Sequence, residues 1–183
     1  MQRCAASRPS SPRSSVKGME TTWTTAAWFL PFVTPIALYV AWTDLSMMKI
    51  TNKAVLALLI VFVVVGLIAL PFTDYLWRYT HFAVILGIGF VMNAVGLMGG
   101  GDAKFGAAMA PFIALGDWFI FWWVLAGTTL ASYIVHRLVM NSRLRETVPH
   151  WESWQSKKFP LGFALGPALI IYLILPFILP AAG

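Results

Sequence analysis

The sequence is dominated by long apolar blocks that are separated by short polar breaks. The blocks are Ala26–Thr43, Ala54–Phe72, Thr80–Met98, Ala103–Gly116, Trp118–Val139 and Leu161–Ala182. A helix of about 20 residues is needed to cross a hydrocarbon core about 30 Å thick. Only 11% of the residues are charged, against about 25% in soluble domains. The blocks therefore predict an all-α, polytopic membrane helix bundle with about six transmembrane helices in the lipid bilayer. They exclude a water-soluble globular enzyme.

The fourth block, Ala103–Gly116, is the shortest, and as a helix it covers only about 21 Å. It can cross the bilayer only if the preceding Gly99–Gly101 lies at membrane depth. Non-helical backbone is tolerated there only where protein or a water-filled cavity surrounds it. We therefore expect Asp102, which follows the three glycines, to face a wet recess inside the bundle.

The basic residues predict the orientation of the bundle. One set of loops and their flanks holds eight of them, whereas the opposite loops hold only Arg78. The eight are Lys49, Lys53, Lys104, Arg137, Arg143, Arg145, Lys157 and Lys158. Basic loops face the cytoplasm, so this set is assigned there. The net charge of +6 reflects this loop bias, and no basic stripe with interleaved aromatic residues predicts a nucleic-acid partner.

The chain divides into a polar tail, residues 1–22, and a membrane domain, residues 23–183. The tail is rich in Ser, Arg and Pro, and we expect it to be disordered. Its basic residues would lie outside the cell if the orientation above holds. Met19 offers an explanation, because a chain that starts there carries only Glu20 before the first span. Whether residues 1–18 belong to the protein or are a start-site extension stays open.

Four of the seven acidic residues are aspartates in or beside apolar blocks. Functional use is the default hypothesis for an ionisable group near a membrane core. Asp74 and Asp117 fall in turns on the far side, where we expect solvated or helix-capping carboxylates. Asp44 and Asp102 both fall at the cytoplasmic end of their blocks. Two carboxylates in one semi-buried site cannot both ionise easily, so one acts as acid and the other as base.

The residues alone leave other interpretations of Asp44 and Asp102 open. The pair could cap helices and interact with Lys49 and Lys104, or it could relay protons in a proton-coupled transporter or channel. No metal site and no cofactor are predicted. The single cysteine, Cys4, lies in the tail, and the three histidines lack the spacing of a metalloprotease.

Two sequence motifs resemble those of the type IV prepilin peptidase family, membrane-embedded aspartic proteases with a G-x-G-D motif. The segment from Gly99 to Lys104 is similar to the G-x-G-D-x-K signature. The segment from Asp44 to Asn52 resembles the first aspartate motif, with Ile50 and Asn52 in place, Lys49 where arginine is common and Thr51 where proline is usual. A third element, from Lys158 to Ala164, resembles the start of the last span of the family. The resemblance covers about residues 24–180.

The resemblance implies an aspartic endopeptidase with Asp44 and Asp102 as the catalytic pair. Gly99, Gly101, Lys49, Ile50, Asn52 and Lys104 are its implied motif residues. The family removes the short basic leader of prepilin-like proteins at the cytoplasmic face of the bacterial inner membrane. The implied partners are a prepilin or pseudopilin helix and pilus assembly machinery.

Larger members of the family also N-methylate the new N-terminus and carry a cysteine-rich zinc segment. This chain lacks those cysteines, so it resembles the minimal, peptidase-only branch that serves Tad/Flp-type pili. Two interpretations of Lys104 are open. In one its side chain contacts an acidic group of the substrate, and in the other it pairs with Asp102 or extends to the membrane interface.

Overall fold

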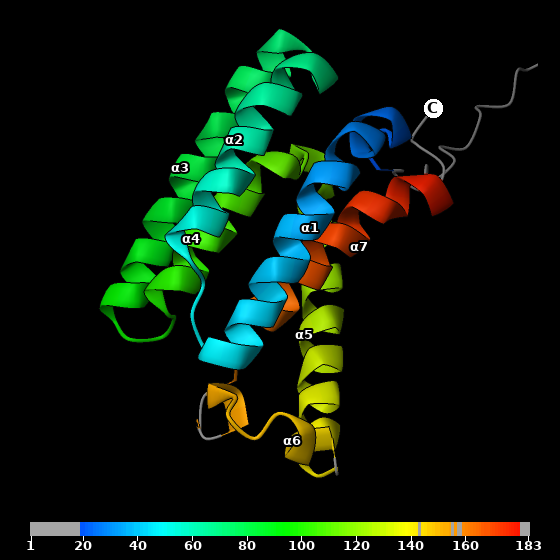
Figure 1. Ribbon diagram of the computed structural model, residues 1–183. Coiled ribbons are helices and arrows are strands. Elements are labelled where there is room, and N and C mark those ends of the chain that lie inside the picture. Colours follow the sequence, from blue (N-terminus) through cyan, green and yellow to red (C-terminus); the bar gives the residue numbers. More distant parts are fainter. Residues whose placement is uncertain (1–18, 143, 155, 157–158, 180–183) are drawn as a thin grey trace, which may run out of the picture.

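The structure is a computed structural model and describes residues 19–142, 144–154, 156 and 159–179 (Figure 1). This part of the chain is helical, which confirms the prediction of an all-α bundle. The long helices are α1 (Trp23–Met47), α2 (Asn52–Ala69), α3 (Phe72–Ala94), α5 (Trp118–Met140) and α7 (Gly162–Ile178). The shorter elements are α4 (Gly100–Met109), η1 (Ala110–Phe112), η2 (Leu115–Asp117), α6 (Leu144–Thr147) and η3 (Glu152–Trp154).

Four helical segments are long and apolar enough to cross a membrane. They correspond to α1, α2, α3 and a segment that runs from Leu115 through α5. Helix α7 is also apolar but has 17 residues, so it is about 25 Å long. The first, second, third, fifth and sixth apolar blocks of the sequence thus each correspond to one helix, and the chain is a polytopic membrane protein.

The fourth apolar block does not form a single span. Non-helical backbone does precede it, at residues 95–99, but Gly100 and Gly101 already belong to α4, which has 10 residues. A second break comes after Met109, and Pro111 explains it. Its ring lacks an N–H and clashes with the carbonyl one turn earlier, so α4 cannot continue through η1. The expected non-helical segment is therefore shorter than predicted, and a second one lies within the block.

Side chains of α3 bind the carbonyls that this break leaves free. The buried guanidinium of Arg78 donates from Nη1 to the Pro111 carbonyl at 3.0 Å. His81, one turn later, places Nδ1 3.2 Å from the Ile113 carbonyl. Irregular backbone inside a membrane protein needs such partners because lipid supplies none. Arg78 is thus a buried structural residue within α3. The prediction that it lies in a polar loop is wrong.

The helices pack in two groups, with α2 between them (Figure 1). In the first group α7 packs against both α1 and α5, and in the second α3 packs against α4; α2 contacts α1 and α4. Aromatic rings join the groups in the core, where Phe112 of η1 lies 4.9 Å from Phe29 of α1 and 5.5 Å from Phe62 of α2, between ring centroids. Each group carries one of the two aspartates of interest.

Small residues allow α1 and α7 to approach closely. A Cβ atom added at Gly166 would lie 2.5 Å from the Ala37 carbonyl oxygen. Ala37, Ala164 and Ala168 are completely buried at this contact or beside it. Close backbone approach through small residues is a common way for membrane helices to associate. This contact fixes α7 against α1, and so determines where the first turn of α7 meets the last turn of α1.

Candidate active site

Asp44 lies in the last turn of α1 and is 5% exposed. Its Oδ2 accepts a hydrogen bond from the Phe163 N–H at 3.2 Å. Phe163 is in the first turn of α7, where free backbone N–H groups and the helix dipole favour a negative charge. The start of α7 therefore holds the Asp44 carboxylate in place.

Gly162 makes this contact possible. A Cβ atom at this position would lie 2.9 Å from Asp44 Oδ2 and 2.8 Å from Ile50 Cδ1. Only glycine lets the helix end come so close to the carboxylate. Gly162 was not among the predicted site residues, although it lies in the segment from Lys158 to Ala164 that resembles the family. Lys158 itself is outside the described residues. The signal that could have identified Gly162 is a glycine two residues after Pro160, at the start of an apolar block.

Asp102 lies in the first turn of α4, and its side chain folds back toward the helix start. A Cβ atom at Gly99, the N-cap residue, would lie 2.7 Å from Asp102 Oδ2. The carboxyl group is partly buried. Burial, and to a smaller extent the nearby charge of Asp44, raises the pKa of Asp102 to about 6, against the lowering effect of a backbone hydrogen bond with Gly99. The protonated form of Asp102 is thus favoured well above the ordinary range of a carboxyl group.

Asp44 and Asp102 line the same two cavities. The larger has a volume of about 740 Å³ and is also lined by Asn93 and Phe159. The smaller, of about 220 Å³, is also lined by Lys49. The structure thus brings together two aspartates that lie on different helix groups. It leaves Asp74, which is exposed in the first turn of α3, outside these cavities.

The connection between α1 and α2 forms one wall of the smaller cavity. Met48 ends α1 with a positive φ of 50°, and Ile50 then passes between α4 and α7. A Cβ atom at Gly101 would lie 3.2 Å from Ile50 Cβ. Gly101 and Gly162 thus make room for Ile50 from two sides. Thr51 accepts a hydrogen bond from the Ala54 N–H at 3.3 Å and caps α2, so a threonine cap begins the helix where proline is usual in the family that the sequence resembles.

Lys104 and Asn52, two further predicted motif residues, lie together outside the shared cavities. Lys104 Nζ donates a hydrogen bond to Asn52 Oδ1 at 3.4 Å, and both side chains are exposed. The contact joins the start of α4 to the start of α2. Lys104 and Asn52 thus join two helices at the rim of the site.

Aromatic residues of the connection between α5 and α7 cover the end of the bundle where the aspartates lie. Trp151 meets Trp42 of α1 with ring centroids 5.5 Å apart, and Trp154 stacks on His136 of α5 at 5.0 Å. The same connection supplies Phe159 to the larger cavity.

Asp117 belongs to a separate polar cluster. It is 1% exposed, and it accepts hydrogen bonds from the N–H groups of Glu20 at 2.7 Å and Thr21 at 2.9 Å, and from the Tyr172 hydroxyl at 2.8 Å. The expectation of a solvated or helix-capping carboxylate is therefore wrong for Asp117. It instead fixes residues 20–21, the described end of the predicted tail, against η2 and α7. The tail before Met19 lies outside the described residues.

A model of the type IV leader peptidase family matches residues 32–137, a range that includes both Asp44 and Asp102. No curated protein and no solved structure matches the chain.

Proposed function

Since the chain belongs to the type IV leader peptidase family, we propose that it is an aspartic endopeptidase that removes the short basic leader from prepilin-like proteins. The observation that carries this proposal is that Asp44 and Asp102 line the same cavities. Glycines give both carboxylates the space that they need, Gly162 for Asp44 and Gly99 for Asp102. Membership of the family supports the peptidase activity, and the paired carboxylates support its assignment as an aspartic peptidase.

In the proposed mechanism the two aspartates share one proton. The ionised carboxylate takes a proton from a water molecule, whose oxygen attacks the carbonyl carbon of the scissile peptide bond. The protonated carboxyl group gives its proton to the carbonyl oxygen. The tetrahedral intermediate then collapses and the C–N bond breaks. The leaving amine takes the proton that the first carboxylate had removed from water, and a hydroxyl group of the intermediate returns its proton to the second carboxylate. The raised pKa of Asp102 supports such sharing, since two neighbouring carboxylates do not both ionise easily.

We place the site at the cytoplasmic face of the bacterial inner membrane. Lys49, which lines the smaller cavity, and Lys104 at its rim lie beside the aspartates, and basic residues near span ends favour that side. The only basic residue predicted on the opposite side, Arg78, is buried within α3, which strengthens the asymmetry. The chain has one cysteine, so we propose peptidase activity without N-methylation.

The test is co-expression of the chain with a prepilin substrate of a Tad/Flp-type pilus, followed by electrophoresis for leader removal. Asp44→Asn and Asp102→Asn should each reduce cleavage by about 10⁴-fold or more, because the members of a catalytic unit act together. Asp74→Asn, which changes an exposed aspartate outside both cavities, is the matched control and should cleave normally. Normal cleavage by either variant of the pair would disprove the assignment.

A further inference from the structure

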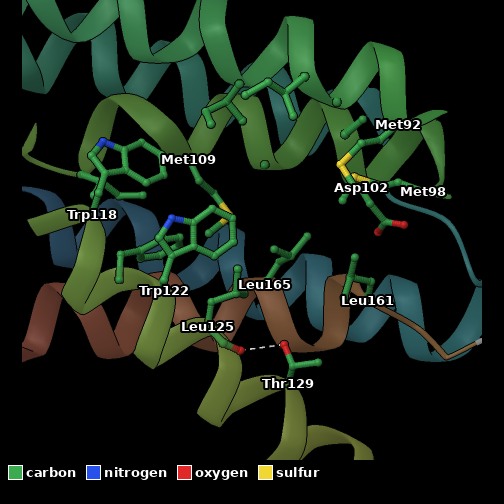
Figure 2. A pocket seen from close by; sticks show the side chains of 17 residues that line it. Met92, Met98, Asp102, Met109, Trp118, Trp122, Leu125, Thr129, Leu161 and Leu165 are labelled. Atoms are coloured by element: carbon green, nitrogen blue, oxygen red, sulfur yellow. Dashed lines mark hydrogen bonds between the residues drawn. The ribbon is translucent and has the colours of Figure 1, made fainter. Parts of the chain in front are cut away.

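An apolar groove begins at Asp102 and leads away from the two aspartates (Figure 2). It has a volume of about 200 Å³, and its lining comes from α3, α4, α5 and α7. Figure 2 shows Asp102 at one end with Met92 and Met98 beside it, and Trp118 and Trp122 toward the other end. Among the described residues of the lining, Asp102 is the only charged one. The candidate active site is therefore continuous with a surface suited to apolar side chains.

We propose that this apolar groove binds one face of the hydrophobic helix that follows the leader in the substrate. The inference rests on the proposed function and assigns part of substrate recognition to residues outside the aspartate pair. Gly106, Met109 and Leu165 of the groove would contact the substrate helix, and Asp102 would meet the peptide bond at its start.

The spacing of the α4 residues in the lining fits a helical ligand. Asp102, Gly106 and Met109 line the groove at positions i, i+4 and i+7, which form one face of a helix. They extend over about 10 Å, or two turns of a helix packed alongside. A cavity of about 200 Å³ is too small for a helix about 10–12 Å wide, but it can accept apolar side chains from one face of a helix.

The position of the groove predicts a ligand that comes from the membrane. It lies between the α3–α4 pair and the α5–α7 pair; α3 packs mainly against α4, and α5 packs mainly against α7. Two of its lining residues, Ile88 of α3 and Trp122 of α5, are 51% and 57% exposed on helices long enough to span the bilayer. A helix in the surrounding lipid can therefore reach the groove laterally.

The distribution of polarity gives the bound substrate a direction. The larger cavity shared by the two aspartates is lined in part by Asn93 and is more polar than the groove beyond Asp102. A substrate with a basic leader followed by an apolar helix would match this change if the leader lies on the polar side. The methionines at 92, 98 and 109 add flexible, polarisable contacts, which suit helices of differing sequence.

Gly106 provides a sharp test because a Cβ atom there would meet no other atom within 4 Å. Gly106→Leu would place its Cβ atom in open space, and the rest of its side chain would take up part of the groove. Gly127→Leu is the matched control, since Gly127 of α5 is equally open and does not line the groove. Both changes replace a helical glycine with a better helix former, so both variants should fold.

The measurement uses the full chain in lipid nanodiscs and a synthetic peptide with a basic leader and an apolar helix of about 20 residues. Gly106→Leu should weaken binding at least tenfold and raise KM for cleavage, whereas Gly127→Leu should match the wild type. Cleavage of a shorter peptide that lacks the helix should not change in the control variant Gly127→Leu.

Binding and cleavage are read separately so that the two proposals can fail separately. Wild-type binding of the long peptide by Gly106→Leu would overturn the groove assignment, whether or not cleavage occurs. Weakened binding by Gly106→Leu, with no cleavage even by the wild type, would support the groove and overturn the peptidase proposal.

Discussion

At the scale of single residues, the candidate site depends on glycines as much as on aspartates. Gly99 leaves space for the carboxylate of Asp102, and Gly162 for that of Asp44. In both cases a helix begins at or beside the glycine, so backbone N–H groups and the helix dipole lie near the negative charge. The chemistry requires the carboxylates, but their positions are fixed by residues that have no side chain.

Gly162→Ala should abolish most of the cleavage and leave the fold intact. The added methyl group would meet the ends of two side chains, Asp44 and Ile50, at under 3 Å. These can move, so the backbone need not, but the Asp44 carboxylate would shift. A displacement of about 1 Å can reduce catalysis about 100-fold.

The measurement for Gly162→Ala is the prepilin cleavage rate, together with the melting temperature in detergent. Gly127→Ala, on an open face of α5, is the control for adding a methyl group to a helix. A Gly162→Ala variant as active as this control would show that the contact with Asp44 is unimportant.

The sequence predicted part of this site and missed the rest for a physical reason. Asp44, Asp102, Gly99 and Gly101 belong to local motifs, so they were recognisable. The partner of Asp44 is a backbone N–H 119 residues away, and every residue except proline has such a group. No side-chain pattern could therefore identify it.

At the scale of elements, the connection from α4 to α5 is where hydropathy was misleading. Residues 110–116 are apolar like the spans around them, so they read as part of a membrane helix. The backbone there is not α-helical, because Pro111 ends α4 and donors from α3 bind the freed carbonyls. Hydropathy reports where a segment can lie, but hydrogen-bond partners from another helix decide its conformation.

Asp117→Ala should destabilise the protein by about 2–4 kcal/mol. Its carboxylate binds two backbone N–H groups and the Tyr172 hydroxyl in a buried cluster. Each buried donor left without a partner costs about 1–3 kcal/mol. The melting temperature in detergent should fall well below that of Asp74→Ala, in which the lost carboxylate is exposed. Equal melting temperatures would mean that the Asp117 cluster contributes little.

At the scale of the whole molecule, the two aspartates are on different helix groups, Asp44 with α1 and α7 and Asp102 with α3 and α4. Five of the six apolar blocks each predicted one long helix, since block length is a local property, but the fourth block did not. They could not predict which helices pack together. That depends on contacts such as Gly166 against Ala37, between residues far apart in the sequence.

The stability of the whole molecule should fall as the pH rises from about 4 to about 6. The pKa of Asp102 is raised from 3.8 to about 6 in the folded protein, so the folded state binds more protons than the unfolded state across this interval. Asp102→Asn removes the effect. At neutral pH it should stabilise the protein by about 1 kcal/mol, an amount reduced for the partial solvent exposure of the group.

The corresponding measurement is the melting temperature of wild type and Asp102→Asn in detergent at pH 4 and pH 7.5. A difference of about 2–4 °C in favour of the variant is expected at the higher pH, and little difference at the lower one. A variant that is less stable than the wild type at pH 7.5 would contradict the burial of this carboxyl group.

The hydrogen bond between Asp44 and the start of α7 has a consequence for biosynthesis. The two residues that it joins are 119 positions apart, and α7 is the last helix of the described chain. At about 5–20 residues per second, the ribosome needs roughly 6 to 24 seconds to make the intervening chain. During that time α1 is complete but the carboxylate lacks its backbone partner. The newly made protein therefore cannot assemble this site before α7 has entered the membrane.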